Sequence, residues 1–305
     1  AGIKAAVLMA HAFNDWNVVP EHSVRIASAL KGRVPLRMYF HQGGHGGDPT
    51  LAMVNRWFSR FLYDIPNGVD QGPRAWIMRE PTQGQKDGAP QLPTPYADYP
   101  NPAASVVTLH PGTGGSAMGP LGLRVPRKQG METLVDNVEI AGAALAAAGH
   151  RLLYATPELL SPVHLSGTPR ITLRLASSKP AANLSVWLVV LPWTDGPIGP
   201  ANVITRGWAD PQNHASLKSG GDYHSMKRGE PLVPGRFYRL TFDLQPDDQV
   251  IPAGKRIGLM IFSSDRDFTL WPQPGTELTV DLDGTSLRLP VVGGRSWFAE
   301  AVGKE

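Results

Sequence analysis

Two side chains near the start of the chain are of the types that move protons in hydrolytic sites. Asp15 lies in a polar segment, residues 11–17, and His45 lies in a glycine-rich segment, residues 41–47. A carboxylate hydrogen-bonded to an imidazole holds the ring in one tautomer and stabilises the cation that forms when the ring takes a proton. The pair could therefore serve nucleophilic catalysis, provided that a nucleophile lies beside the imidazole.

The elements around these segments are predicted to form part of a parallel sheet. Residues 3–10 are an unbroken apolar run, which is typical of a strand buried on both faces, and residues 35–40 predict the next strand. Helices are predicted over residues 20–30, which begin with proline, and over residues 48–61, which begin with Asp-Pro. The apolar face of the second helix is expected to pack on the sheet and consists of Leu51, Val54, Trp57, Phe58 and Phe61.

Both polar segments follow predicted strands, so they should meet at the carboxyl edge of the sheet. This is the edge at which open α/β sheets carry their chemistry. We therefore expect Asp15 and His45 to lie within hydrogen-bond distance of each other. The alternative is that both are ordinary solvated turn residues, but their matching positions at two strand ends favour a functional pair.

A second histidine competes for the role of the base. His41 directly follows the strand and could instead be a packed core residue, while His41, His45 and Asp48 together could suggest a metal site. The glycines between the two histidines interrupt the helix that an i,i+4 pair of ligands needs, and no further ligand is defined. We expect no metal and no cofactor here, and a structural role for His11.

Composition narrows the classes of partner and chemistry. The 305 residues carry a formal net charge of +3 without a basic cluster, which gives no support for binding nucleic acid or a membrane surface. The sequence also holds no apolar run of the length that spans a bilayer. It contains no cysteine, which excludes disulfides, thiolate zinc sites and a cysteine nucleophile.

The chain contains no recognisable serine nucleophile. A hydrolase of the α/β class exposes its serine on a sharp G-x-S-x-G turn between a strand and a helix. Ser116 lies in a glycine-rich loop with Met118 where the second glycine belongs, and Ser296 follows the last predicted strand with Phe298 in that place. We reject both and expect the nucleophile on a missing N-terminal part or on another chain.

The rest of the sequence predicts an all-β domain. Residues 81–104 are rich in proline, glutamine and glycine and are assigned to a polar linker. The number and spacing of the strands beyond it predict a jelly-roll β-sandwich over residues 105–305. The predicted strands are residues 105–109, 151–155, 169–176, 184–191, 236–243, 256–263, 277–282 and 286–291.

Aromatic residues are scattered through this domain. They could line a carbohydrate groove, but scattered tryptophans are more often core residues, so we expect packing within and between domains. The set is Trp187, Trp193, Trp208, Tyr223, Trp271 and Trp297. Asp265 and Asp267 are expected to be turn residues, and we assign no chemistry to this domain.

Two of the loops resemble a known family. Residues 14–18 (NDWNV) and 41–45 (HQGGH) are similar to the acid and histidine loops of bacterial Xaa-Pro dipeptidyl-peptidases. These are serine peptidases grouped with cocaine-esterase-like and cephalosporin-ester-hydrolase-like enzymes. Residues 57–62 (WFSRFL) and 65–69 (IPNGV) also resemble that family. The resemblance covers nearly the whole chain but only the C-terminal half of a family member.

The resemblance implies a fold and three site residues. Residues 1–80 would be the C-terminal segment of an α/β-hydrolase domain, followed by the linker and the β-sandwich. Asp15 would be the triad acid, His45 the general base, and Asn17 a contact to the N-terminal dipeptide of the substrate. An amide suits that contact because it donates to a carbonyl and accepts from an ammonium, although Asn17 could instead satisfy its own loop backbone.

The resemblance also implies a reaction and a partner. The substrate would be a peptide with proline at the second position, and the N-terminal half of the enzyme would supply the serine. Esterase members usually differ in both loops, which favours the peptidase branch. The alternatives are an esterase or β-lactam acylase of the same superfamily, or a non-catalytic glycan-binding module that retains the two loops.

Overall fold

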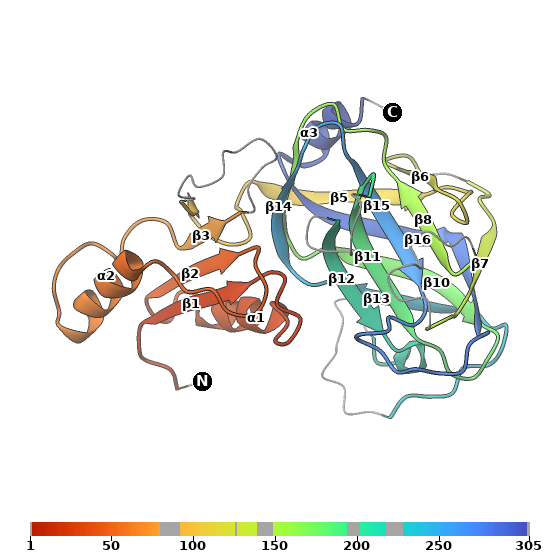
Figure 1. Cartoon of the computed structure of the whole chain (residues 1–305), viewed down its shortest axis with the longest axis horizontal. Helices are drawn as coiled ribbons and strands as arrows, with labels where there is room; N and C mark the ends of the chain where they lie inside the picture. Colours follow the sequence, from red (N-terminus) through yellow and green to blue (C-terminus); the bar gives the residue numbers. More distant parts are fainter. Residues whose placement is uncertain are drawn as a thin grey trace.

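The computed structural model describes residues 2–79, 92–125, 127–138, 149–193, 202–217 and 228–303. The chain forms two units, which Figure 1 shows side by side. The first hundred residues form a small sheet with two helices, and the remainder forms a larger all-β unit. Within the described residues, no helix is long and apolar enough to span a membrane.

The small sheet has three parallel strands and one antiparallel strand, in chain order. They are β1 (Val7–Ala12), β2 (Leu36–His41), β3 (Ala75–Met78) and β4 (Thr94–Tyr96). Helix α1 (Glu21–Leu30) connects β1 to β2, and α2 (Leu51–Leu62) follows β2. Ala12 pairs with His41, so β1 and β2 end at the same level of the sheet. The two polar segments therefore begin side by side.

Three features of this unit differ from the sequence prediction. Strand β1 begins at residue 7 instead of residue 3, because its pairing partner β2 begins only at Leu36. Strand β3 was not predicted, since four residues are too short to show a pattern. Strand β4 lies within the stretch assigned to a linker, of which residues 81–91 fall outside the described part.

Helix α2 lies at the far end of the small sheet in Figure 1. Of the apolar face that was expected to pack on the sheet, only Trp57 is buried, and it packs against Phe61. Leu51 and Phe58 are exposed, so the prediction that this face packs on the sheet is wrong for the described residues. The helix forms for a local reason, since Thr50 caps it by accepting a hydrogen bond from the Met53 N–H.

Twelve strands of the described residues form the second unit, and all but one of their pairings are antiparallel. The hydrogen-bonded order is β12-β11-β15-β8-β6-β5-β16-β10-β13, with β7 and β9 on β16 and β14 on β9. The strands are β5 (Ala104–Pro111), β6 (Gly119–Gly122), β7 (Met131–Val135), β8 (Arg151–Ala155), β9 (Val163–Gly167), β10 (Arg170–Ser177), β11 (Leu184–Leu191), β12 (Val203–Ala209), β13 (Tyr238–Asp243), β14 (Asp247–Ile251), β15 (Arg256–Phe262) and β16 (Glu277–Val292). A short 3₁₀ helix (Pro211–Asn213) follows β12, and α3 (Gly294–Ala301) follows β16.

The last two predicted strands are one continuous strand. The sequence predicted separate strands over residues 277–282 and 286–291, but β16 runs through the Asp283-Gly284 pair between them while keeping β10 as its neighbour. The register between the two strands shifts there, so the extra residues form a bulge. A Cβ at Gly284 would lie 2.7 Å from the side chain of Arg174, which explains the need for glycine at this position.

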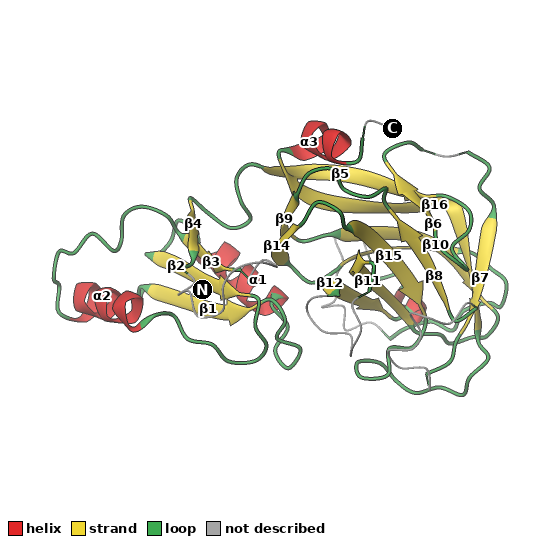
Figure 2. Cartoon of the chain, turned by 45° about the horizontal axis from the view of Figure 1, so that its top comes forward, coloured by secondary structure: helices red, strands yellow, loops and turns green. Residues whose placement is uncertain are grey.

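Strand β14 lies on the side of the second unit that faces the first (Figure 2). The two units meet there through buried charged groups. The fully buried carboxylate of Asp248 accepts hydrogen bonds from Arg79 and from His164, both at 2.9 Å. Arg79 comes from the end of β3 in the first unit and also donates to Tyr96 of β4. A buried carboxylate is tolerable only when it is paired in this way.

We predict that Arg79→Met lowers the free energy of unfolding by about 3 kcal/mol, because it leaves Asp248 buried with one partner fewer. Arg25→Met is the matched control, since Arg25 forms a solvent-exposed pair with Glu21 and should leave stability nearly unchanged. Urea unfolding of both variants measures the difference. Equal midpoints would show that the Arg79–Asp248 pair does not hold the two units together.

Candidate active site

Asp15 lies in the loop after β1, where backbone N–H groups of the same loop hold its carboxylate. Its carboxylate is buried, and its Oδ1 accepts hydrogen bonds from the N–H groups of Asn17 and Val18, each at 3.0 Å. The loop stays attached to the sheet because the Phe13 N–H donates to the carbonyl of His41 at 2.8 Å. This arrangement leaves the second carboxylate oxygen available for another partner.

That partner is His45. Its Nδ1 donates to Asp15 Oδ2 at 2.9 Å, so the loops after β1 and β2 meet as the strand ends predict. The side chain of His45 is 61% exposed, in contrast to that of Asp15 at 6%. Because Nδ1 carries the proton of the neutral ring, the lone pair of Nε2 is free to accept one. No described residue forms a hydrogen bond with Nε2.

The electrostatics keep the carboxylate ionised. Burial raises the pKa of Asp15, but hydrogen bonds from the Val18 N–H, the His45 ring and the Asn17 N–H together outweigh it. The net result is a pKa below the usual range for an aspartate. An ionised carboxylate at Nδ1 is the partner that stabilises a protonated imidazole.

His41 has a structural position. It is buried at the end of β2, burial lowers the pKa of its ring, and Nδ1 accepts from the Gly43 N–H at 3.1 Å. A Cβ at Gly43 would lie 2.9 Å from this ring, and one at Gly47 would lie 2.5 Å from it. The loop that carries His45 therefore wraps around the His41 ring, and glycine is required where it does so.

His11 supports the acid loop, as the sequence predicts. Its Nε2 donates to the Val18 carbonyl at 2.7 Å, and its Nδ1 accepts from the Ser23 hydroxyl at 2.5 Å. The same Nε2 lies 3.6 Å from the carboxylate of Asp15. The ring thus ties the acid loop to the first turns of α1.

The side chain of Asn17 is exposed and forms no hydrogen bond with a described residue, while its N–H is used by Asp15. It does not satisfy its own loop backbone and is available for an external partner. Ser116 and Ser296 both lie in the second unit, the latter within α3. Neither contacts His45 among the interactions of the described residues.

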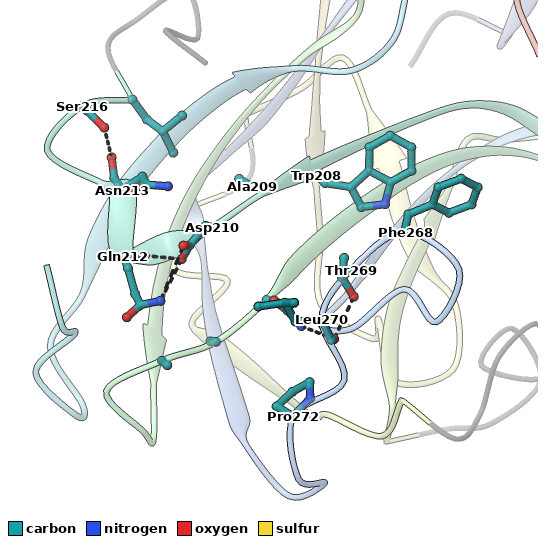
Figure 3. Close-up of a pocket in the computed structure, with 14 residues that line it drawn as sticks. Trp208, Ala209, Asp210, Gln212, Asn213, Ser216, Phe268, Thr269, Leu270 and Pro272 are labelled. Atoms are coloured by element: carbon teal, nitrogen blue, oxygen red, sulfur yellow. Dashed lines mark hydrogen bonds between the residues drawn. The ribbon is translucent and has the colours of Figure 1, made fainter. Parts of the chain in front are cut away.

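The second unit contributes aromatic side chains to the acid loop, and for Trp208 this confirms the expected packing between domains. Trp16, beside Asp15, packs edge-on against Trp208 and Phe268 with ring centroids 6.0 and 5.9 Å apart. Trp208 and Phe268 also line a pocket of about 440 Å³ in the second unit, which Figure 3 shows. Its polar wall includes Asp210 and Asn213.

Asp265 was expected to be a turn residue, and its backbone carbonyl does begin a turn by accepting from the N–H groups of Phe268 and Thr269 at 2.9 and 2.8 Å. Its side chain has a further role that was not predicted. It is buried and accepts hydrogen bonds from the indole N–H groups of Trp187 and Trp208, at 3.0 and 2.9 Å. Burial raises its pKa, while the two indoles and Arg206 act in the opposite direction. The aspartate orients two tryptophans, and no periodic pattern in the sequence marks such a role.

Comparison with known proteins places these features in a family. Residues 67–295 match the model of the X-Pro dipeptidyl-peptidase C-terminal non-catalytic domain. The chain is 56% identical over 299 residues to a Rhodopirellula baltica protein assigned to the Xaa-Pro dipeptidyl-peptidases, which covers 96% of this chain and 45% of the relative. It is 28% identical over 322 residues to the Xaa-Pro dipeptidyl-peptidase of Lactobacillus delbrueckii subsp. lactis, covering 94% and 40%.

Solved structures show the same fold at low identity. A CocE/NonD family hydrolase from Staphylococcus aureus has a TM-score of 0.73 at 12% identity, over 95% of this chain and 55% of its own. An α-amino acid ester hydrolase has a TM-score of 0.66 at 14% identity, over 95% and 56%. The chain spans under half the length of the curated relatives above. It belongs to the Xaa-Pro dipeptidyl-peptidase family and corresponds to the C-terminal half of its members.

Proposed function

We propose that this chain is the C-terminal portion of a serine hydrolase that releases Xaa-Pro dipeptides from peptide N-termini. The observation that carries the proposal is the 2.9 Å hydrogen bond between a buried carboxylate and an exposed imidazole at the ends of adjacent parallel strands. Both residues precede residue 67, where the match to the non-catalytic domain begins. Asp15 and His45 would thus be two members of a catalytic triad.

The geometry supports an acyl-enzyme mechanism. His45 Nε2 takes the proton of the serine hydroxyl as the serine oxygen attacks the carbonyl carbon of the substrate's proline. The protonated ring then gives this proton to the leaving amine as the peptide C–N bond breaks. Water attacks the acyl-enzyme with His45 again as base, and the serine is regenerated. Asp15 stays ionised throughout and stabilises the imidazolium.

The serine and the oxyanion donors would come from the N-terminal half of the enzyme. Two features of the first unit support such a partner. Strand β1 pairs only with β2 among the described strands, which leaves its outer edge open, and the apolar residues Leu51 and Phe58 of α2 are exposed. The N-terminal half would extend the sheet beyond β1 and so complete an α/β-hydrolase domain.

For the second unit, we propose a jelly-roll β-sandwich.

The alternatives receive different support. The fold is shared with an α-amino acid ester hydrolase, which keeps an acyl esterase as the second candidate. A glycan-binding groove loses support because Trp187 is buried, and because its N–H and that of Trp208 are both used by Asp265. The variants His45→Ala and Asp15→Asn test catalysis, and Asn17→Ala distinguishes a peptidase from an esterase.

In the complete enzyme, His45→Ala should reduce hydrolysis of a Xaa-Pro anilide to near the background rate, because the base is lost. Asp15→Asn should reduce kcat by roughly 10³–10⁴-fold, since an amide favours the wrong tautomer of His45. Asp48→Asn, an exposed change in the same loop as His45, is the control and should leave kcat unchanged. Retention of full activity in His45→Ala would exclude the assignment of the base.

Asn17→Ala should weaken the peptidase reaction selectively. Its amide is exposed and would bind the substrate's N-terminal dipeptide in the proposed reaction. Loss of such a contact costs roughly tenfold to a hundredfold in kcat/KM. A short-chain ester lacks that dipeptide and should react at nearly the same rate as before. Comparison of kcat/KM for both substrates tests this prediction. Equal losses would mean that Asn17 only supports the acid loop.

A further inference from the structure

The loops of the acid and the base are joined directly by two buried polar residues. Asn14, which precedes Asp15, donates through its amide to the backbone carbonyl of Gln42 at 2.7 Å and to its side-chain oxygen at 3.2 Å. Gln42 lies three residues before His45 and is buried, as is Asn14. A shift of either loop would therefore displace the other.

Gln42 also reaches into the second unit. Its amide nitrogen donates to the carboxylate of Asp247 at 2.9 Å and to the backbone carbonyl of Asp248 at 2.7 Å, both on β14. Every polar atom of this side chain thus has a partner in the structure. Such a fully satisfied buried amide fixes the geometry on both sides of it, because a lost bond would leave a buried group unpaired.

The other neighbour of Asp15 is held by the same unit through a different contact. Besides its packing on Trp208 and Phe268, the Trp16 ring contacts a cation. Its centroid lies 4.7 Å from the guanidinium of Arg206, and the same guanidinium lies 4.4 Å from the ring centroid of Trp187. Desolvated contacts between a cation and aromatic faces are strong. Asp265 orients both Trp187 and Trp208 by accepting hydrogen bonds from their indole N–H groups.

We propose that the second unit positions the triad through these two contacts, with Gln42 and Trp16 as the positioning residues. The proposal rests on the function proposed above. Asp15 is held from both neighbours in the sequence, through Asn14 and Gln42 on one side and through Trp16 on the other. His45 itself is exposed and bonded only to Asp15 among the described residues, so its place depends on how firmly the acid is held.

The test compares Gln42→Met with Tyr99→Phe. Methionine has nearly the length of glutamine but no amide, so it removes the contact to β14 and to Asn14. Tyr99→Phe removes a different buried hydrogen bond between the same two units, from the Tyr99 hydroxyl to the backbone carbonyl of Asp247 at 3.0 Å. It keeps the aromatic ring that packs on Phe13 and leaves the Asp247 carboxylate bonded to Gln42. Both variants should lose stability, and only Gln42→Met should affect the triad.

In the complete enzyme, Gln42→Met should lower kcat by roughly tenfold to a hundredfold, since small misplacements of catalytic groups cost this much. KM should change by less than about twofold, because Gln42 does not reach solvent. In this chain, proton NMR should show the hydrogen-bonded Nδ1 proton of His45 broadened or lost in Gln42→Met and retained in Tyr99→Phe. Should Gln42→Met fail to fold, Trp16→Leu tests the second contact with the same readouts.

Two outcomes separate this proposal from the proposed function. An unchanged kcat and an unchanged His45 resonance in Gln42→Met, or in Trp16→Leu if that variant is used, would overturn the positioning role while leaving the hydrolase intact. An inactive parent enzyme would overturn the proposed function, and the NMR comparison would still decide whether β14 holds the Asp15–His45 pair. Equal effects of Tyr99→Phe and Gln42→Met on the His45 resonance would also overturn the proposal.

Discussion

Two adjacent carboxylates buried at the junction of the units set the arrangement of this protein. Asp247 and Asp248 can remain buried only if hydrogen-bond donors reach them, and the first sheet provides these from two of its strand ends. Gln42 follows β2 and reaches Asp247, while Arg79 follows β3 and reaches Asp248. Because both donors come from the carboxyl edge of the sheet, that edge must face β14. The edge that carries the candidate chemistry is therefore also the edge that holds the units together.

The domain that matches the non-catalytic family model contacts both loops of the candidate site at this junction. The match covers residues 67–295 and includes the described groups of the second unit that contact the two loops. Arg206 lies against Trp16, and Asp247 accepts from Gln42. Neither Arg206 nor Asp247 forms a hydrogen bond or an ion pair with His45 in the described part of the chain. A domain can be free of catalytic residues and still determine the distance between an acid and a base.

The sequence was sufficient to predict the pair Asp15 and His45, because two apolar runs with polar ends report parallel strands directly. It was not sufficient for the contacts that hold the pair. Gln42 and Asp247 are 205 positions apart, and nothing periodic marks a polar loop residue whose partner lies in another unit. The same reason explains why the burial of the Asp265 side chain was not predicted, since buried and exposed aspartates look alike in a short polar segment.

In the second unit, strands with a long regular pattern could be predicted from the sequence. The prediction failed where it depended on a short local signal. The eight-residue strands β10 and β11 show their alternation or apolar run clearly, whereas the seven-residue strand β12 was not predicted. The Asp283-Gly284 pair has the residues of a hairpin turn, yet it forms a bulge because β10 continues alongside both halves of β16. Tertiary pairing decided between two conformations that the dipeptide permits equally.

The ring of His41 has a consequence for how this family can vary. The loop that carries His45 packs closely against the His41 ring. Positions 43 and 47 are glycine there because a Cβ at either position would overlap the ring. A relative with a smaller residue at position 41 would have space for a side chain at position 43, and a relative with a larger one would need a different loop. Positions 41 and 43 should therefore covary across the family, whereas position 47 should remain glycine because its φ of +88° disfavours any side chain.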